Sequence, residues 1–546
     1  MKPITRRTAL GLGAAAVAAP LLASCGGAGS DSETQDKIDN PDANINKTGM
    51  PIVKESITLH MMTRHRPSTA DDWNTVKSVK KLEELTNIKV DWGPVPWEGA
   101  AEKRNLALAS GDYPAILNRT AVSAVDLAKY GEQGTFIALN ELIDEYMPNL
   151  KGVMDKYPDI AKGMTMPDGN IYSMPTIYDP AFDSLMMQQK LWIRKDWLDD
   201  FGMSEPETLE EFEAFLTEVK GKNPVKKGSP AAIPFTDGSA IGWLVQMFWG
   251  AFGIGTRGEA ANPLDADPSG ALRFFPTSEE YKEHLTFLNK LYSKGLIQSD
   301  VFSNDSAKFN TLGKQGLVGA AAMQAPIASF GQEEGEKYVA LGPLKRSSGD
   351  EVPTWNPVGS GLASMGQFVL TDKSTHPIET ARWIDYRYGD EGSRLFFMGI
   401  EGESYEETGD GQYEFTDEIT DNPDGLTVDE ALKPYVTYLG GSYAGIVKEA
   451  YFKGTESSPQ AREGAEKIAP YRIEEVWPDF TYTSDEAAEL SSLTVDLDKL
   501  RTEARDTFIN GKKSLKEWNN YLEDFDRIGL SRYMEIQQAA YDRYTG

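Results

Sequence analysis

The apolar positions of this chain change their spacing several times, and each change predicts a switch between strand and helix. From residue 56 they alternate (SITLHMM), which predicts a strand over 56–62, and Thr69 and Asp71 are expected to cap the helix that follows. That helix is expected to bury the residues that recur every third position, Trp73, Val76, Val79, Leu82 and Leu85. The next expected elements are a strand at 88–92, a helix at 101–110 and a strand at 115–117. This βαβαβ order predicts a parallel sheet with helices on its faces.

Further along the chain, helix-start signals stand between short apolar runs. Thr208, Thr277 and Ser514 each stand three residues before a glutamate, which is the pattern of a capping box. Between and after these signals we expect strands at 232–235, 316–322 and 365–370, and a helix from His376-Pro377 onward. The pattern over residues 484–544 predicts an almost continuous helix with breaks at two glycines. The pattern as a whole indicates two α/β lobes and a helical C-terminal cap.

The first 25 residues (MKPITRRTALGLGAAAVAAPLLASC) have the layout of an export signal, with a short basic region, an apolar stretch and then small residues. Leu22-Ala-Ser-Cys25 resembles a bacterial lipobox, in which residues 1–24 are removed and the cysteine is lipidated. A plain signal peptide with an incidental cysteine is the alternative. Arg6-Arg7 fits a twin-arginine signal only in part, so the Sec and twin-arginine routes both stay open.

Residues 25–54 are rich in Gly, Ser, Asp and Asn, and we expect them to form a flexible tether behind the lipidated Cys25. Two or more acyl chains, at about 0.8 kcal/mol per buried methylene, would anchor the protein durably at the extracytoplasmic face of the cell membrane. No later segment reaches about 18 uninterrupted apolar residues, so no second membrane span is expected.

Composition narrows the function classes. The 546 residues allow two to four domains, and 40 % hydrophobic residues indicate a globular protein. The formal charge is −29, and it becomes −32 when residues 1–24, with three basic residues and no acidic ones, are removed. A field of that sign repels phosphate backbones and anionic lipids, which argues against nucleic-acid and membrane-surface partners. Four histidines and one cysteine leave little material for a metal site built from those residues.

A search for catalytic motifs finds little. Residues 253–258 (GIGTRG) spell G-x-G-x-x-G, but they follow an apolar helix rather than a strand, so we interpret them as a helix end with spare glycines. Asp265-Ala-Asp-Pro-Ser-Gly270 has a faint likeness to a calcium loop but lacks the distal glutamate, and we interpret it as a polar turn. The chain contains no P-loop, no G-x-S-x-G and no H-E-x-x-H, so a binding protein is favoured over an enzyme.

Aromatic residues in expected loops are the stronger functional signal. Trp97, Tyr178 and Trp355 lie beside prolines at expected strand ends and in loops, where flat rings suit the stacking of sugars. Core packing is the alternative for each of them. Trp73 and Trp383 stand on helical stripes and are expected to be buried.

Short motifs in a fixed order carry a resemblance to a known family. They stand at 106–114 (LALASGDYP), 136–143 (FIALNELI), 167–172 (PDGNIY), 191–198 (LWIRKDWL), 281–297 and 399–405 (GIEGESY). Together with the lipobox they resemble the extracellular solute-binding lipoproteins of ABC importers, in the large saccharide-binding branch with LipO-like and alginate-oligosaccharide-binding proteins. The resemblance implies an α/β, periplasmic-binding-protein-like (type II) fold of two lobes, with a hinge and a helical C-terminal cap.

One departure from that family concerns calcium. Where the family often carries a calcium loop, residues 223–235 (NPVKKGSPAAIPF) have lysines in place of carboxylate ligands. We therefore expect no structural calcium of the family type, no other metal and no cofactor.

The resemblance implies that ligand is held in a cleft between the lobes, at loops that follow strands. The expected ligand-binding residues are Arg64, His65, Arg66, Trp97, Asn118, Arg119, Tyr178, Asp179, Asp237, Trp243 and Trp355. Arg66 and Arg119 suit a uronic-acid carboxylate, but they equally suit the protein's own acidic residues. His65 is as well explained by an ordinary surface loop.

The sequence thus predicts a lipid-anchored, non-enzymatic and monomeric receptor that delivers an oligosaccharide to the permease subunits of an ABC importer. A surface-tethered glycosidase or lyase is the alternative, and an adhesion protein without transported ligand is a third possibility. The expected division of the chain is a signal peptide (1–24), lipidated cysteine and tether (25–54), first part of the N-terminal lobe (55–180), second lobe (181–370), and crossover, return and helical cap (371–546). Neither the sugar nor the permease is specified.

Overall fold

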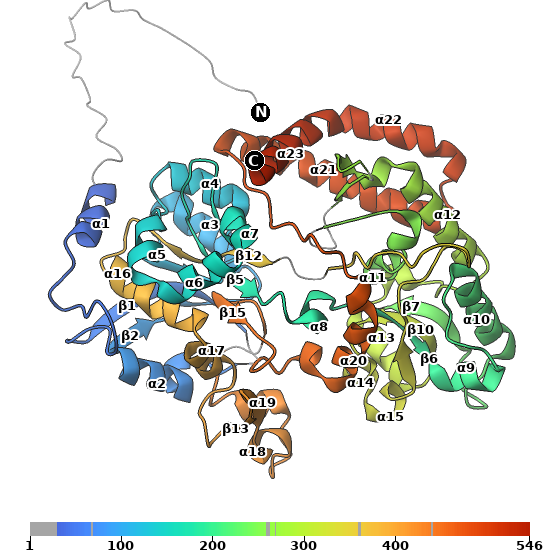
Figure 1. Ribbon diagram of the computed structural model, residues 1–546, viewed down its shortest axis with the longest axis horizontal. Helices are drawn as coiled ribbons and strands as arrows, with labels where there is room; N and C mark the ends of the chain where they lie inside the picture. The colour runs from blue at the N-terminus through green and yellow to red at the C-terminus, as the bar shows by residue number, and fades with distance from the viewer. Residues whose placement is uncertain (1–29, 67–68, 258–262, 268, 359–361, 438–439) are drawn as a thin grey trace, which may run out of the picture.

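The computed structural model describes residues 30–546 except 67–68, 258–262, 268, 359–361 and 438–439. Two lobes lie side by side, and three C-terminal helices lie along the top of the molecule (Figure 1). Each lobe is built on its own sheet, with a separate large apolar core. The predicted mixed α/β two-lobe architecture is therefore present.

The first lobe is built on a sheet in which β1 lies parallel to β2, β3 and β4. This confirms the predicted βαβαβ order. β12 runs antiparallel to β4 and β5, and β15 runs parallel to β5. The strands are β1 (Ile57–His65), β2 (Ile88–Asp91), β3 (Pro94–Pro96), β4 (Ile116–Asn118), β5 (Met174–Tyr178), β12 (Ala363–Leu370) and β15 (Gly445–Val447). The helices are α2 (Lys77–Thr86), α3 (Ala100–Ser110), α4 (Ala124–Glu132), α5 (Asn140–Tyr146), α6 (Pro148–Lys156), α7 (Pro158–Met164), α16 (Pro377–Asp385) and α17 (Asp390–Phe397).

The start of α2 differs from its prediction. Asp72, rather than Thr69 or Asp71, is the cap, and it accepts from the Asn74 amide at the start of a short 3-10 turn. The α-helix itself begins only at Lys77, because Val76 is extended. The first helical amides donate instead to the carbonyls of Pro434 and Tyr435, which come from a distant part of the chain. Trp73 and Trp383 are buried, as predicted.

The second lobe has a smaller sheet in the order β11-β6-β10-β7, in which β10 is parallel to β7 and antiparallel to β6. The capping box at Thr208 is confirmed. The second predicted box, at Thr277, is wrong: Thr277 belongs to a 3-10 turn, and Ser278 caps α12 by accepting from the Tyr281 amide. The strands are β6 (Lys190–Arg194), β7 (Ile233–Asp237), β8 (Leu264–Ala266), β9 (Leu272–Phe274), β10 (Val318–Met323) and β11 (Tyr338–Ala340). The helices are α9 (Lys195–Phe201), α10 (Leu209–Lys222), α11 (Gly242–Gln246), α12 (Glu279–Ser293), α13 (Ser306–Lys314), α14 (Pro326–Phe330) and α15 (Gln332–Gly335).

Three crossover segments join the lobes: residues 179–189, 341–362 and 448–483. They contain α8 (Asp183–Met186) and α20 (Pro459–Ile468). The segments hold one another: Arg472 donates to Asp183 at 2.6 Å, and the Trp355 amide donates to the Tyr471 carbonyl at 2.6 Å. Because β12 pairs with β4 and β5, residues 363–370 belong to the first sheet, and the second lobe ends earlier than the sequence suggested.

The C-terminal cap consists of α21 (Ser484–Ile509), α22 (Trp518–Ile528) and α23 (Leu530–Thr545), and its continuous helical character is confirmed. The third capping box predicted for the chain, at Ser514, lies in the cap and is also confirmed. α21 contacts α4 of the first lobe and α12 of the second, and Asn289 of α12 donates to the last carbonyls of α21. The 3-10 turns of the described chain are Trp73–Thr75, Gly250–Phe252, Phe275–Thr277, Val301–Ser303, Tyr386–Tyr388, Thr455–Ser457, Ala469–Tyr471 and Leu515–Glu517.

The expected tether is largely folded. α1 (Ser30–Asp39) contacts α16, and the segment after it follows the first lobe to β1. Ile38 of α1 and Ile45, Ile52 and Val53 of this segment are buried in the core of that lobe. Arg382 holds the segment by donating to the carbonyls of Asn46 and Gly49. The prediction of a flexible tether is therefore wrong from about residue 34 onward. Cys25 and the export signal lie outside the described residues.

Candidate functional site

A cavity of about 780 Å³ lies where the two lobes and the third crossover meet. Arg66 comes from the loop after β1 in the first lobe, and Gln324 follows β10 in the second. Residues 452–456 supply the crossover wall. The rest of the lining comes from residues between α17 and β15, namely Phe397, Phe415, Val428, Asp429, Leu432, Gly440 and Gly441. Its size and its mixture of aromatic and polar residues suit a small organic ligand. We call this cavity the cleft.

A larger groove of about 1160 Å³ lies on the second-lobe side of the molecule, between α10 and α12. Aromatic residues such as Phe252 and Phe287 form part of it, and its charged residues include four glutamates, three lysines and one arginine. The first lobe contributes no residue to it, and only Arg346 and Ser347 come from a crossover segment, so a movement of the lobes would change it little. We therefore take the cleft, rather than this groove, as the candidate site.

Four of the predicted ligand-binding residues are brought together on the first-lobe side of the cleft. The guanidinium carbons of Arg64 and Arg66 lie 3.7 and 3.8 Å from the ring centroid of Trp97, and that of Arg119 lies at 5.4 Å. Arg64 also donates to the Trp97 carbonyl at 3.0 Å. These residues stand at the carboxyl ends of β1, β3 and β4, which confirms that strand ends converge here.

The geometry changes the role expected for Trp97. Two guanidinium groups within 4 Å of its centroid cover much of the ring, so it stacks on arginine in this structure. Arg119 is 4 % exposed and sits in a left-handed turn (φ 57°), where its amide donates to the Gln367 carbonyl. Arg66 is exposed and is the member of this group that lines the cleft.

His65 and Asn118 turn away from the cleft. The ring of His65 packs 5.6 Å from that of Trp73, and its Nε2 lies 2.9 Å from the Ala70 carbonyl oxygen. Asn118 is 2 % exposed and donates to the Thr63 hydroxyl at 3.4 Å. Both residues therefore sit within the first lobe in this structure, as the alternative interpretation of His65 allowed.

Tyr178 and Asp179 begin the first crossover beside the cleft. A Cβ on Gly441, which lines the cleft, would lie 3.9 Å from the Tyr178 ring. The Asp179 carboxylate accepts from the Tyr157 hydroxyl and the Ala181 amide. Tyr178 thus lies next to the cleft wall, while Asp179 helps to shape the turn that leaves the sheet.

Asp237 is fully buried, and its carboxylate is used inside the second lobe. It accepts from the amides of Ile241, Trp243 and Leu244, each at 2.9 Å, and from Ser239. Burial raises the pKa of Asp237, and these hydrogen bonds oppose that shift. The prediction of Asp237 as a ligand contact is corrected, because its oxygens hold the start of α11.

The two remaining predicted tryptophans belong to the second-lobe core. Trp355 is 2 % exposed and packs in that core, and Trp243 is half-buried against it. Neither is among the residues that line the cleft. Because a ring without exposure presents no face to a ligand, we do not carry the stacking role of Trp355 forward.

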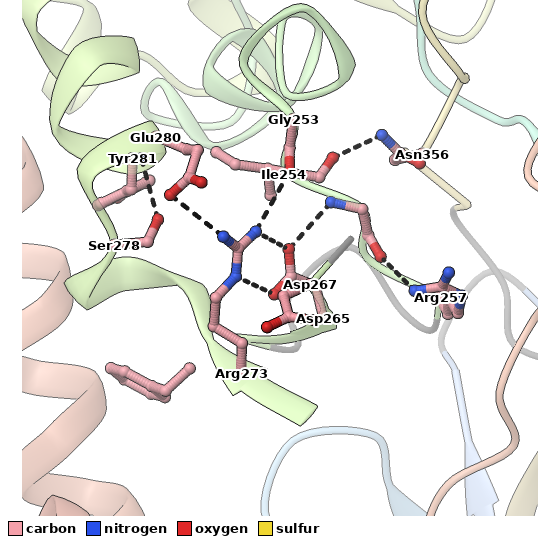
Figure 2. Close-up of polar contacts among 12 residues, drawn as sticks. Gly253, Ile254, Arg257, Asp265, Asp267, Arg273, Ser278, Glu280, Tyr281 and Asn356 are labelled. Carbon is pink, nitrogen blue, oxygen red and sulfur yellow. Dashed lines mark hydrogen bonds and ion pairs between the residues drawn. The ribbon is translucent and has the colours of Figure 1, made fainter. Parts of the chain in front are cut away.

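The glycine-rich motif at 253–257 forms part of a polar cluster in the second lobe (Figure 2). Gly253 ends a 3-10 turn in the left-handed region (φ 73°), which confirms the helix-end interpretation. Asp265, also fully buried, accepts from the Gly255 amide at 3.0 Å and from Arg273 at 2.8 and 2.6 Å. Asn356 donates to the Ile254 carbonyl at 2.6 Å. The predicted polar turn is the β8–β9 hairpin, and its buried aspartate pairs with arginine.

Residues 77–401 match the family described as bacterial extracellular solute-binding protein. This chain belongs to that family. The resemblance inferred from the ordered motifs is therefore confirmed, and so is the expectation of a binding protein rather than an enzyme.

Two curated relatives and two solved structures show which solute-binding proteins this chain resembles. It is 28 % identical to the fructooligosaccharide ABC transporter substrate-binding protein FusA of Streptococcus pneumoniae, over 96 % of both chains. It is 28 % identical to the lipoprotein LipO of Bacillus subtilis, over 84 % of this chain and 87 % of LipO. The structure of FusA with kestose has a TM-score of 0.73 at 26 % identity, over 90 % of this chain and 99 % of FusA. An extracellular solute-binding protein of Bifidobacterium longum subsp. infantis shares the fold, with a TM-score of 0.77 at 22 % identity, over 91 % of this chain and 100 % of that chain.

Sequence reasoning missed much of the cleft of this solute-binding protein. The third crossover supplies Phe452, Lys453 and Glu456, and Gln324 follows β10. Burial raises the pKa of the Glu456 carboxyl, which the charge of Lys190 opposes, and burial lowers the pKa of fully buried Lys190 to about 8. The glycine-punctuated run 452–456 (FKGTE), between a strand and a helix, was the available signal.

The calcium loop of the family has no counterpart with acidic ligands in this solute-binding protein. Asn223 ends α10 in the left-handed region, and its side chain accepts from the Ala232 amide at 2.7 Å. Across the described chain, no group of three or more His, Cys, Asp or Glu residues is placed to hold a metal ion. Within the same residues, no helix is long and apolar enough to cross a membrane.

Proposed function

We propose that this protein is a lipid-anchored receptor that captures an oligosaccharide in the cleft and delivers it to an ABC importer. The cleft carries the proposal, because its lining comes from both lobes and from a crossover between them. A ligand that contacts both lobes favours the arrangement in which they are closest, so binding becomes a change of shape that a permease can read. The relatives named for fructooligosaccharide and for polygalacturonan or rhamnogalacturonan support a saccharide ligand.

We expect one oligosaccharide class from a panel to bind without being cleaved, and we expect Arg66→Ala to weaken that binding about tenfold. Arg66 is the exposed first-lobe cation of the cleft, so its loss removes contacts from one wall. Calorimetry with kestose, longer fructooligosaccharides, oligogalacturonides and alginate oligosaccharides measures both effects, and chromatography of the ligand detects cleavage.

The matched control is Arg527→Ala, because Arg527 is an exposed arginine of the C-terminal cap, outside the cleft. It should leave affinity unchanged. Binding that is insensitive to Arg66→Ala would remove the cleft from the proposal. Repeated turnover with bond cleavage would instead favour a carbohydrate-active enzyme.

The anchor is the second part of the proposal. LipO, a relative, is named a lipoprotein, and Cys25 ends the lipobox-like run. Five residue steps from Cys25 to Ser30 reach at most about 18 Å. Since α1 contacts α16, the anchor would keep this edge of the first lobe close to the bilayer. The first lobe itself would then be held near the membrane, without a long tether.

We expect Cys25→Ser to move the protein from the membrane fraction to the soluble extracytoplasmic fraction. Without the thiol no acyl chain can be attached, and about 0.8 kcal/mol of membrane affinity per buried methylene is lost. Fractionation with detection by antibody measures the shift, and mass spectrometry of the wild-type N-terminus identifies the acyl groups. A Ser24→Ala control keeps the cysteine and should stay in the membrane. A Cys25→Ser protein that stays there too would contradict the anchor.

A further inference from the structure

Residues 401–437 form a small folded unit at the lower edge of the first lobe (Figure 1). It contains β13 (Tyr405–Gly409), β14 (Gln412–Phe415), α18 (Asp417–Thr420) and α19 (Val428–Leu432). Its own apolar cluster is built on Ile419, Ala431, Leu432 and Val436. A capping box between Thr427 and Glu430 fixes the start of α19. We call this unit the cleft module.

The cleft module is attached to the first lobe through α2. The amides of Lys77 and Ser78 donate to the carbonyls of Pro434 and Tyr435 at 2.9 and 3.2 Å. The Lys77 ammonium also pairs with Glu403 and lies over the Tyr435 ring. Backbone bonds of this kind couple the module to α2, so it should follow the first lobe when the lobes move relative to each other.

One side of the module faces the cleft. Phe415, Val428, Asp429 and Leu432 are among the residues that line it. Val428 is 39 % exposed although it is apolar, and the neighbouring Asp429 is exposed as well. Gln324 of the second lobe and Glu456 of the third crossover line the same cavity. The module is therefore a wall of the cleft that belongs to one lobe.

An apolar side chain beside a carboxylate matches the two surfaces of a sugar ring. Val428 and Phe415 can cover the C–H face of a ring, and Asp429 can accept from its hydroxyl groups. Burial of Val428 under a ligand would remove apolar surface from water. The module has a core and attachments of its own, so it forms a firm boundary rather than a loose loop.

We propose that the cleft module holds the terminal ring of the bound saccharide and so sets the longest chain that the cleft accepts, with Val428 as the residue that determines this limit. This inference rests on the proposed function. It assigns the module a share in specificity in addition to that of Arg66, which lines the same cavity.

The test is Val428→Trp, with Leu426→Trp as the matched control. Leu426 lies two residues away in the same module and is 44 % exposed, but it does not line the cleft. Calorimetry with a length series of fructooligosaccharides, from kestose upward, and with a length series of oligogalacturonides gives an affinity for each chain length. Thermal unfolding of each variant checks that it is folded.

Val428→Trp should weaken binding of the longest chain that the wild type binds by at least about tenfold, and leave the shortest within about twofold. Leu426→Trp should keep the wild-type length profile. Equal profiles for the two variants, or an equal loss at every length in Val428→Trp, would overturn the inference while the proposed function stands. A wild type that binds no member of either series would count against the proposed function itself and against this inference with it.

Discussion

Replacing Asp237 by alanine should lower the free energy of unfolding of this solute-binding protein by about 3–5 kcal/mol. The carboxylate is fully buried and accepts from four backbone amides and one hydroxyl between Ser239 and Leu244. Alanine would leave the Ser239, Ile241 and Leu244 amides in the second-lobe interior without this acceptor, whereas the Trp243 amide keeps the Ser239 hydroxyl oxygen. The loss is large because the donors are backbone groups that cannot turn away.

The same carboxylate also stabilises an unusual backbone. Ala240 and Ile241 have φ angles of 50° and 71°, in the left-handed region that residues with a Cβ rarely adopt, and a β-branched residue is especially disfavoured there. Bonds from the Ile241 amide and its neighbours to Asp237 hold this turn. Chemical denaturation followed by tryptophan fluorescence should therefore show an earlier transition in the variant.

Asp267→Ala is the control for Asp237→Ala. Asp267 accepts from the Ser269 and Ala271 amides in a similar local arrangement, but it stands at the surface turn between β8 and β9, where water can replace it. The unfolding midpoint of the Asp267→Ala variant should stay close to that of the wild type. Equal losses in the two variants would show that burial of the Asp237 cluster is not the cause.

The fold was predictable where local spacing determines structure. The alternation at 56–62 identified β1, and the threefold repeat after it identified α2 through Val79 and Leu82, although Trp73 and Val76 of that repeat lie before the helix and Leu85 is only half-buried. Pairing between distant segments was not predictable: β12 lies beside β4 and β5, a choice made by the topology of the whole sheet. The N-terminal segment was misassigned because Ile38, Ile45 and Ile52 are seven residues apart with no buried apolar residue between them, which matches neither the spacing of a strand nor that of a helix face.

The candidate site, like the fold, was predictable only where a local sequence rule applies. The rule that ligands lie at the carboxyl ends of strands led to Arg64, Arg66, Trp97 and Arg119, which do converge beside the cleft. It did not distinguish a carboxylate that faces a cavity from one that caps a helix, so Asp237 was assigned to the ligand. The walls formed by the third crossover and the cleft module carry no strong motif, because hydrophobic packing and backbone geometry, rather than spacing, bring them to the cleft.

Trp355→Ala is expected to lower the free energy of unfolding by about 3–5 kcal/mol, because it empties the volume of a buried indole. The position is also where two crossover segments join. The Trp355 amide donates to the Tyr471 carbonyl at 2.6 Å, and the Ile473 amide donates to the Trp355 carbonyl at 3.2 Å. A cavity at this junction would loosen the alignment of the segments that connect the lobes.

Trp355→Phe separates packing from ligand contact. The indole Nε1 is buried and has no hydrogen-bond partner within the described part of the chain, so phenylalanine loses volume but no hydrogen bond. We expect this variant to lose about 1–2 kcal/mol of stability and to bind saccharide as tightly as the wild type. Denaturation and calorimetry on the same preparations measure both quantities. A Trp355→Phe protein of wild-type stability whose affinity falls tenfold would contradict a purely packing role for the ring.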